Sequence, residues 1–486
     1  MSRSHPATAV RPPRSVPRPP APQGNRWQRW RRVLRERRRL AGPGQEVNPR
    51  RPVQMVALGF VAGIAVGTLL LLLPVATTGE HASFLEAFFT AVSAICVTGL
   101  IVVDTPEYWS GFGQAVIAVL IQIGGFGVMT MASVLGLMIS RRLGLQTRRV
   151  AAASTRTLSL GDVASLLLTV LRTTIILEAA VTVILTARWM IGYGEPFGRA
   201  LWLGLFHAIS AFNNAGFALY SDSLMGFATD PWICVPIMLA FVLGGIGFPV
   251  LIELYRHLRT PRRWTLHTKI TVLATAVLVP AGTLFVLVAE WNNPGTLGPL
   301  DGPGKVLAAL FQGVTPRTAG FNSVDIGQMN TGTWLGLDVL MFIGGGSGGT
   351  AGGIKVTTFA LLGFVIWAEL RGDRDVAAFH RRVPPRTVRE AVTVALLAVA
   401  AVMGSTIVLA MSSPFDLDQI LFEVISAFGT VGLSTGITAD LAPGHQVLLC
   451  VLMFLGRLGP ITLGTALAMR SHQQAFRYPE STAVIG

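Results

Sequence analysis

Four short windows of this sequence repeat one pattern, and this repeat limits the possible folds more than any other feature. Each window holds a phenylalanine, then a serine or threonine, then a glycine followed by an apolar residue. The windows are FFTAVSAICVTGL (88–100), FHAISAFNNAGF (206–217), FQGVTPRTAGF (311–321) and FEVISAFGTVGL (422–433). The glycine comes six positions after Ser93, Ser210 and Ser426, and five positions after Thr315. Such an internal repeat predicts a fold assembled from copies of one unit.

A second glycine marker follows each window at a similar interval. Gly124-Gly125, Gly244-Gly245, Gly344-Gly345 and Gly456-Arg457 begin 25, 28, 24 and 24 residues after the window glycines. Two markers that stay in step four times indicate four units. We expect each unit to contain an outer helix, a short helix, a glycine loop and an inner helix.

The composition indicates that these units lie in lipid. Of the 486 residues, 51% are hydrophobic and 13% are charged, whereas a soluble domain carries about a quarter charged residues. Apolar stretches reach the roughly 20 residues that a membrane span needs. They are 53–75, 115–139, 163–187, 233–252, 270–289, 391–411, 446–469 and the glycine-interrupted 334–367. The predicted fold is therefore an all-α integral membrane protein with eight spans.

The apolar segments before the four glycine loops are too short to cross a membrane. They are 84–95, 201–212, 305–315 and 419–428. A helix of that length rises about 18 Å, less than the roughly 30 Å hydrocarbon core. Each segment should enter and leave on one side as a re-entrant pore helix. Because irregular backbone at membrane depth must face protein or a water-filled cavity, we expect the four loops to surround a shared pseudo-fourfold axis.

The same reasoning gives boundaries along the chain. We expect a disordered basic cytoplasmic segment over 1–50, because Arg, Pro, Ser and Gln dominate it and cannot form a core. No apolar region precedes Pro52, so we expect no cleavable signal peptide. The pore repeats are predicted at 51–140, 160–256, 267–370 and 388–470, with a cytoplasmic C-terminal tail at 471–486.

The net charge of +14 could suggest nucleic-acid binding, but its distribution favours membrane orientation. Fourteen arginines lie in 1–51, and the loops 140–162, 255–269 and 370–390 hold 5, 5 and 6 Lys or Arg. The opposite loops hold Arg199 alone and many acidic residues. Because Lys and Arg stay on the cytoplasmic side, both termini should be cytoplasmic and the glycine loops should be entered from outside. The outer acidic residues either concentrate cations at the mouth or are ordinary solvated charges.

Two further function classes are disfavoured by residue type. The three cysteines, Cys96, Cys234 and Cys450, are widely spaced, so they predict neither a disulfide framework nor a CxxC metal site. A membrane enzyme would need clustered His, Asp, Glu or Cys near the bilayer, and the sequence has no such cluster. We therefore do not expect an enzyme.

The windows CVTGL, NNAGF, RTAGF and TVGL, together with GGGSGGTAGGIK (344–355), resemble the Trk/Ktr/HKT superfamily of cation transporters over residues 53–470. The Ktr membrane subunits are the most similar branch. The resemblance implies K⁺ uptake across a bacterial cytoplasmic membrane through a four-part selectivity filter. A K⁺ filter replaces the ion's hydration shell with backbone carbonyl oxygens. The candidate filter residues are Val97, Thr98, Gly99, Asn214, Ala215, Gly216, Thr318, Ala319, Gly320, Thr430, Val431 and Gly432.

The number and identity of the filter glycines bear on selectivity. One glycine per loop, where tetrameric K⁺ channels have two, predicts a shorter and less discriminating filter. In the HKT branch a serine at the first filter glycine accompanies Na⁺ preference, so Gly99 indicates K⁺ by analogy. The main alternative is a Na⁺-permeable or weakly selective cation transporter. A metabolite transporter is a distant alternative, because such proteins use two inverted repeats.

Seven glycines interrupt the third inner helix, and each costs about 1 kcal/mol in a helix interior. The resemblance implies an intramembrane gate loop, within 344–357; small residues could instead form a helix-packing groove. Its residues are Gly344, Gly345, Gly346, Ser347, Gly348, Gly349, Thr350, Ala351, Gly352, Gly353, Ile354 and Lys355. Lys355 lies either in this loop or at the cytoplasmic surface.

Several polar residues fall inside apolar segments. Arg457 is costly in mid-span unless it faces the bundle interior or water. The resemblance implies that it is an electrostatic barrier and gate partner in the pore; the alternative is a structural arginine bound to helix-end carbonyls. Glu178 could pair with Arg172 or face a neighbour. His207 and the pair Asn213–Asn214 lie at the second pore helix, where the asparagine side chains could stiffen the loop and packing roles are equally open.

The resemblance also implies partners. K⁺ is the expected substrate, with Na⁺ as a candidate activator, and no cofactor is expected in this chain. Ktr membrane subunits work as homodimers on a cytosolic ring of nucleotide-binding subunits, through which nucleotide would act. The arginine-rich loops 141–149, 256–263 and 381–389 could dock such a ring or anionic membrane lipid, or could reflect orientation alone. No nucleic-acid partner is expected.

Overall fold

The computed structural model describes residues 50–142 and 160–469. The predictions for the N-terminal segment before residue 50, most of the loop 140–162 and the C-terminal tail lie outside the described residues. The chain divides into one unit of Met1–Arg51 and a second of Pro52–Gly486. The second unit is mostly helical, as the sequence predicts.

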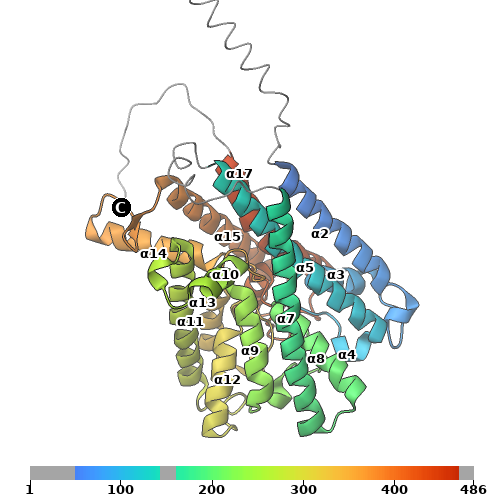
Figure 1. The fold of residues 1–486 in the computed structure, drawn as a ribbon. Helices are drawn as coiled ribbons and strands as arrows, with labels where there is room; N and C mark the ends of the chain where they lie inside the picture. Colours follow the sequence, from blue (N-terminus) through green and yellow to red (C-terminus); the bar gives the residue numbers. More distant parts are fainter. Residues whose placement is uncertain (1–49, 143–159, 470–486) are drawn as a thin grey trace, which may run out of the picture. The chain divides into compact units, whose positions relative to one another are not determined.

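The longer elements follow one another in a regular order (Figure 1). They are α2 (Arg50–Leu71), α3 (Phe84–Cys96), α4 (Thr105–Tyr108), α5 (Gly111–Arg142), α7 (Leu160–Tyr193), α8 (Phe197–Phe212), α9 (Pro231–Ile246), α10 (Phe248–His257), α11 (Leu266–Glu290), α12 (Gly302–Val314), α13 (Thr331–Phe342), α14 (Val356–Arg371), α15 (Pro385–Ser412), α16 (Leu417–Gly429) and α17 (Pro443–Met469). Short 3₁₀ turns lie at Pro74–Ala76, Met225–Phe227, Pro261–Arg263 and Ile326–Gln328. A small antiparallel hairpin pairs β1 (Ala377–Ala378) with β2 (Arg381–Arg382).

Within the described residues, four helical stretches are long and apolar enough to cross a membrane. They are Gly111–Thr130, Leu167–Tyr193, Leu266–Glu290 and Pro385–Ser412; the bent pair α9–α10 makes a fifth candidate. Their outward faces carry large exposed apolar side chains, such as Val183, Val288 and Met411, which are 67%, 71% and 83% exposed. Such surfaces suit lipid and not water, so the chain is an integral membrane protein. The predicted total of eight spans is not reached by this measure.

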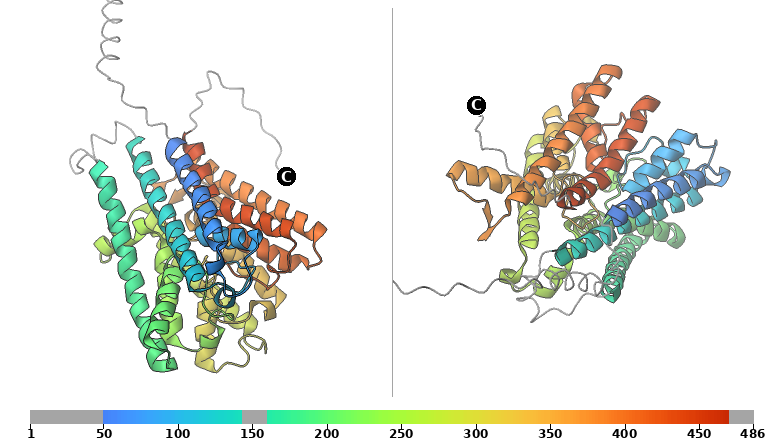
Figure 2. Two further views of the ribbon diagram at one scale, coloured as in Figure 1. Left: turned by 90° about the vertical axis from the view of Figure 1, so that its right-hand side faces the viewer. Right: turned by 90° about the horizontal axis from the view of Figure 1, so that it is seen from above.

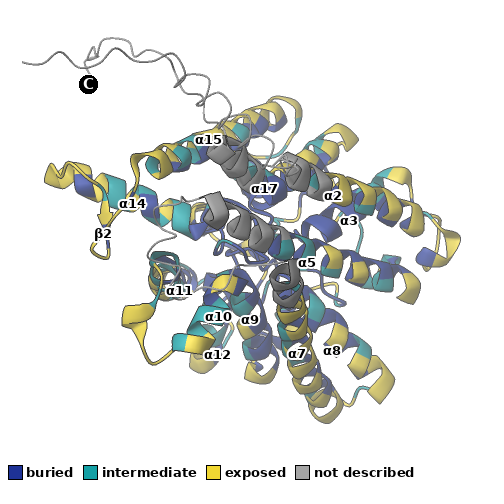
Figure 3. Ribbon diagram, turned by 45° about the horizontal axis from the view of Figure 1, so that its top comes forward, coloured by how far each residue is buried: buried dark blue, intermediate teal, exposed yellow. Residues whose placement is uncertain are grey.

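Four short helices, α3, α8, α12 and α16, lie inside the helix assembly. They have 13, 16, 13 and 13 residues, and their C-terminal halves are largely buried. Local sequence starts them: the Ser83 side chain caps α3 in a capping box with Glu86, and Asp301 caps α12. In Figure 3 the buried segments gather toward the middle and the exposed ones lie on the outer helices.

The helices of the two ends of the described chain meet. Helix α17 packs against α3 as well as against α16, and α16 packs against α13 and α15. Seen from above, the red α17 accordingly lies beside the blue helices of the chain's first part (Figure 2). This contact closes the series of packed helices, so that the four short helices can converge on one region.

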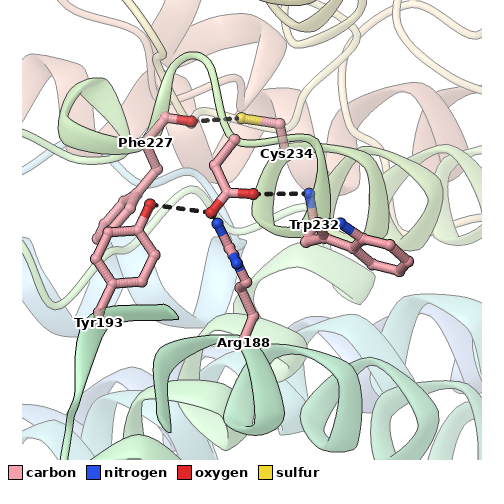
Figure 4. A network of polar contacts seen from close by, with 6 residues as sticks. Arg188, Tyr193, Phe227, Trp232 and Cys234 are labelled. Atoms are coloured by element: carbon pink, nitrogen blue, oxygen red, sulfur yellow. Dashed lines mark hydrogen bonds and ion pairs between the residues drawn. The ribbon is translucent and has the colours of Figure 1, made fainter. Parts of the chain in front are cut away.

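Side-chain bonds fasten the outer helix α7 to the inner helix α9. Asp230, which caps α9, accepts hydrogen bonds from the Arg188 Nε, the Tyr193 hydroxyl and the Trp232 amide, at 2.7, 2.9 and 2.9 Å (Figure 4). The Cys234 thiol donates to the Phe227 carbonyl oxygen at 3.2 Å. The end of α7 is thereby joined to the start of α9.

The second inner helix differs from its prediction. The sequence predicts an uninterrupted span over 233–252, but the chain bends by 100° between α9 and α10. Gly247 at the bend has a φ of 103°, a conformation that only glycine adopts readily. Pro249 then starts α10, where its missing N–H costs no hydrogen bond.

Candidate functional site

The four window glycines adopt the same unusual backbone conformation. Gly99, Gly216, Gly320 and Gly432 have φ values of 93°, 71°, 77° and 94°. The residue two positions earlier is also left-handed in every case: φ is 56° at Val97, 59° at Asn214, 71° at Thr318 and 50° at Thr430. Non-glycine residues with positive φ are uncommon, and β-branched ones are strained. The same conformation at four matching places, three of them strained, indicates a shared requirement.

The four loops contact one another in a closed ring. A β-carbon on Gly99 would collide with the carbonyl oxygen of Ala215, and one on Gly432 would collide with that of Thr98. A β-carbon on Gly216 would lie 2.8 Å from the α-carbon of Gly320. One on Gly320 would lie 2.5 Å from the carbonyl oxygen of Val431. The structure thus brings all four predicted filter segments together, each beside the next.

The amide groups of the loops point away from this ring. Thr98 N–H donates to the Ser93 carbonyl at 2.8 Å, and Gly99 N–H donates to the Ser93 hydroxyl at 3.1 Å. The same two bonds recur from Val431 and Gly432 to Ser426, at 2.9 and 3.1 Å. In the other two loops, Ala215 and Ala319 donate to the Ser210 and Thr315 carbonyls, at 2.8 and 2.9 Å. Because the N–H groups face the helix ends, the peptide oxygens are left to face the opposite side.

The ring opens into a cavity of about 390 Å³. The four glycines line it, together with the carboxylates of Asp104 and Asp325 and the hydroxyl residues Ser434, Thr435 and Thr438. Burial raises the pKa of Tyr220, another lining residue, to about 12, so its phenol stays neutral. The negative charge of the cavity wall therefore comes from the two aspartates. These two carboxylates, together with the negative C-terminal ends of the short helices that point at the ring, favour cations in the cavity and at the ring.

The glycine-rich run 344–355 is irregular, as predicted, and lies between α13 and α14. Its backbone pairs with the break of the second inner helix. Gly346 and Thr350 donate to the carbonyls of Gly245 and Gly244 at 2.8 and 3.1 Å, and Phe248 donates to that of Gly348 at 3.2 Å. Two interrupted helices therefore satisfy each other's peptide groups at membrane depth.

The run also touches two of the four loops. The Thr350 hydroxyl donates to the Asn214 side-chain oxygen at 2.6 Å. A β-carbon on Gly352 would collide with the Thr430 hydroxyl, and one on Gly353 would lie 3.2 Å from the Gly429 α-carbon. The glycines of the run are thus needed for close approach to the second and fourth loops.

Two buried basic side chains bind backbone carbonyls of this run. Arg457 is 1% exposed; its guanidinium donates to the Thr350 carbonyl and, at 3.4 Å, to the Gly124 carbonyl. Lys355 is 8% exposed and donates to the Ala351 carbonyl. Lys355 therefore lies within the run and does not reach the surface. Neither side chain forms an ion pair among the described residues.

The second glycine marker has a physical explanation that the sequence did not supply. β-carbons on Gly124, Gly244 and Gly456 would collide with the carbonyl oxygens of Ile95, Phe212 and Phe428, each four residues before a window glycine. The marker lets an inner helix approach the end of a short helix. In the third unit this contact is absent, and Gly344 faces the Gly352 carbonyl instead.

Glu178 and Asn213 contact each other and lie outside the ring. Glu178 is 7% exposed and accepts hydrogen bonds from the Gln122 and Asn213 amides at 3.3 and 3.1 Å. It therefore faces neighbouring helices. Asn213 packs behind its loop, whereas Asn214 reaches the glycine-rich run.

Comparison with known proteins agrees with this arrangement. The family described as "TrkH: Cation transport protein" matches residues 39–477. The chain is 40% identical to the Ktr system potassium uptake protein B of Bacillus subtilis (strain 168), over 90% of this chain and 97% of that protein. It is 39% identical to the protein of the same name from Vibrio alginolyticus, over 89% of this chain and 94% of that protein.

A solved structure shares the fold. The crystal structure of the potassium transporter TrkH from Vibrio parahaemolyticus superimposes with a TM-score of 0.67 at 21% sequence identity, covering 86% of this chain and 85% of that one. The described helices, the four converging glycine loops and these matches lead to one conclusion. The chain belongs to the TrkH family of cation transport proteins.

Proposed function

We propose that this chain takes up K⁺ across the bacterial cytoplasmic membrane, as the ion-translocating subunit of a Ktr-type system. The observation that carries the proposal is the closed ring of Gly99, Gly216, Gly320 and Gly432, in which amide groups of all four loops bind the ends of the short helices. A ring of peptide oxygens from four segments can replace the hydration shell of K⁺. The relatives with about 40% identity are named as potassium uptake proteins.

In this proposal the chain forms four pore units around one axis, each with two crossings. The third inner span is then α13 and α14 with the glycine-rich run between them, and the second is the bent pair α9–α10. The first and last spans are α2 and α17. The mostly helical fold and the four short internal helices support this count of eight spans.

The run 344–355 is the proposed gate. It lies against the second and fourth loops and is held by Arg457 through the Thr350 carbonyl. A buried guanidinium beside the ion path also repels cations. Opening would require the run to leave Asn214 and Thr430.

Partners and orientation follow from the same family. Two copies of the chain would associate, and a cytosolic nucleotide-binding ring would bind the basic loops on the cytoplasmic side. Both termini would be cytoplasmic and the cavity of about 390 Å³ would face outward. The word "system" in the relatives' names supports a second subunit.

The test is K⁺ uptake by a bacterium that lacks its own K⁺ transporters, with and without a co-expressed nucleotide-binding partner. We expect the chain to restore growth at low K⁺. Gly99→Ser and Gly320→Ser should lower the preference for K⁺ over Na⁺ by roughly tenfold, or about 1.4 kcal/mol, because their side chains crowd the ring. Gly404→Ser is the matched control, since a β-carbon there meets nothing within 4 Å.

The alternative, a Na⁺-permeable or weakly selective transporter, predicts a different result. Uptake of labelled K⁺ by the unsubstituted chain would then be inhibited equally by unlabelled Na⁺ and unlabelled K⁺. The chain would also fail to restore growth at low K⁺ when Na⁺ is present. If Gly99→Ser and Gly320→Ser both retained the original ion preference, as Gly404→Ser should, the filter assignment would be wrong.

A further inference from the structure

Each short helix carries a buried residue at one matching position, three residues before its Ser or Thr. These residues are Thr90, His207, Gln312 and Glu423, and their exposed fractions are 2%, 0%, 0% and 0%. They precede the ring glycines by nine positions, or eight in the shorter third copy. The sequence repeat that places the four ring glycines therefore also places four buried side chains, which form a second layer behind the ring.

In three of the four units this side chain accepts a hydrogen bond from the same peptide group. The donor is the N–H three residues after the ring glycine. His207 Nε2 accepts from Leu219 at 3.3 Å, Gln312 Oε1 from Ser323 at 3.4 Å, and Glu423 Oε1 from Thr435 at 2.9 Å. The bond ties the outgoing strand of each loop to the middle of its own short helix. We call these three bonds the rim tethers.

The first unit has no rim tether. In the described part of the chain, no hydrogen bond joins the Thr90 side chain to Val102, the residue at the matching place. A threonine side chain is shorter than those of His, Gln and Glu. The first loop therefore lacks the bond that ties each of the other three loops to its short helix.

The tethers also differ in charge. The Nδ1 of His207 contacts the Leu203 carbonyl at 2.8 Å, which makes it the donor and leaves Nε2 as a neutral acceptor. Gln312 is neutral. Glu423 accepts from the Ser434 and Thr438 hydroxyls as well as from Thr435, a donor set that suits a carboxylate. Ser434, Thr435 and Thr438 all line the outer cavity.

A second acidic residue near Glu423 is placed differently. Asp338 on α13 is 4% exposed, interacts electrostatically with Glu423 and Asp418, and has no hydrogen-bond partner for either carboxyl oxygen among the described residues. The donors gather on Glu423 and not on Asp338, so of these two carboxyl groups only Glu423 has hydrogen bonds that favour the charged form.

We propose that His207, Gln312 and Glu423 are positioning residues that fix the outer end of the ion filter, and that Glu423 also supplies a buried negative charge behind the outermost cation position. The proposal rests on the function proposed above for the ring. A tethered strand cannot relax around a smaller ion, so the tethers would favour K⁺ over Na⁺. The charge would act through a medium that screens it poorly and would raise the affinity for the entering cation.

The test separates the tether from the charge. Gln312→Met and Glu423→Met remove the acceptor while nearly keeping side-chain length, and we expect the K⁺ over Na⁺ preference to fall by up to roughly tenfold, the size expected for the loss of one hydrogen bond. Glu423→Gln keeps the acceptor and removes the charge, so selectivity should be retained while the KM for K⁺ rises several-fold. Gln312→Glu keeps the tether and adds charge, and should lower that KM.

Thr90→Val is the matched control, since that position has no tether. It should change neither the K⁺ over Na⁺ preference nor the KM for K⁺. Membrane content and the thermal unfolding midpoint of purified protein show whether each variant folds. If Glu423→Met does not fold, Gln312→Met tests the tether and Gln312→Glu tests the effect of charge. If folded Gln312→Met kept the wild-type preference for K⁺ over Na⁺ while Gly99→Ser lost it, the proposed role of the rim tethers would be wrong. The proposed filter would still be supported. Unchanged selectivity in Gly99→Ser as well would refute the filter itself.

Discussion

Val97, Thr318 and Thr430 are β-branched residues in a left-handed backbone conformation, which costs about 1–3 kcal/mol at each position. The short helices impose this conformation, because their last carbonyls and side chains bind the loop amides. The result is a set of peptide oxygens on one side. Strain is tolerated here because the surrounding hydrogen bonds leave the loops no other conformation.

Arg457 gives the first prediction at this scale. Arg457→Gln removes a buried positive charge and weakens the bond to the Thr350 carbonyl, so the run 344–355 should be held less firmly. We expect K⁺ uptake without the cytosolic partner to rise by roughly threefold to tenfold, equivalent to about 0.7–1.4 kcal/mol. Initial rates of ⁸⁶Rb⁺ uptake in proteoliposomes would measure it.

The control for Arg457→Gln is Arg188→Gln. Arg188 is 35% exposed and pairs with Asp230, away from the run. This variant should leave the uptake rate unchanged. Equal rates for Arg457→Gln and the unsubstituted chain would show that Arg457 is a structural residue bound to helix-end carbonyls.

Sequence reasoning located the ring glycines, because four copies at fixed spacing are visible without a structure. It did not find the left-handed residues before them, since β-branched side chains argue against positive φ. It also left open what Glu178 and His207 contact. Their partners, Asn213 and Leu219, are distant in sequence or separated by a loop, and no local pattern encodes such contacts.

At the scale of secondary-structure elements, the inner helices illustrate what periodicity misses. The seven glycines of 344–355 predicted one interruption, and the structure has it. The second interruption, at Gly247, lies in an apolar run whose composition suits a continuous span. Its signal was available in the close spacing of Gly244, Gly245, Gly247 and Pro249. The two breaks depend on each other because their backbones exchange hydrogen bonds.

Gly247→Ala tests that dependence. A β-carbon at φ 103° is strained and would lie 2.7 Å from the Ser347 carbonyl oxygen, so the variant should lose about 1–3 kcal/mol of stability. Thermal unfolding of the detergent-solubilised protein should show a lower midpoint. Gly404→Ala, in an open position within α15, should keep or slightly raise it. A Gly247→Ala midpoint equal to that of Gly404→Ala would mean that the bend does not need glycine.

At the scale of the whole molecule, the distribution of charge and the fold together predict how the chain is oriented in the membrane. The basic loop at 255–269 and the acidic outer cavity should lie on opposite sides of the membrane, because Lys and Arg resist translocation. The sequence predicted this asymmetry from loop counts alone. The structure adds Asp104 and Asp325 in the wall of one cavity, which the sequence could not place together.

Orientation can be tested with single cysteines, because Cys96, Cys234 and Cys450 are all buried. Arg262→Cys lies in an exposed turn between α10 and α11, and Asn292→Cys lies in an exposed loop after α11. A membrane-impermeant maleimide should label Asn292→Cys in intact cells and Arg262→Cys only after permeabilisation. Since α11 alone separates the two positions, the pair also tests whether this helix crosses the membrane. Labelling of both from outside would mean that it does not, and the reverse pattern would place the cavity on the cytoplasmic side, where it could not collect external K⁺.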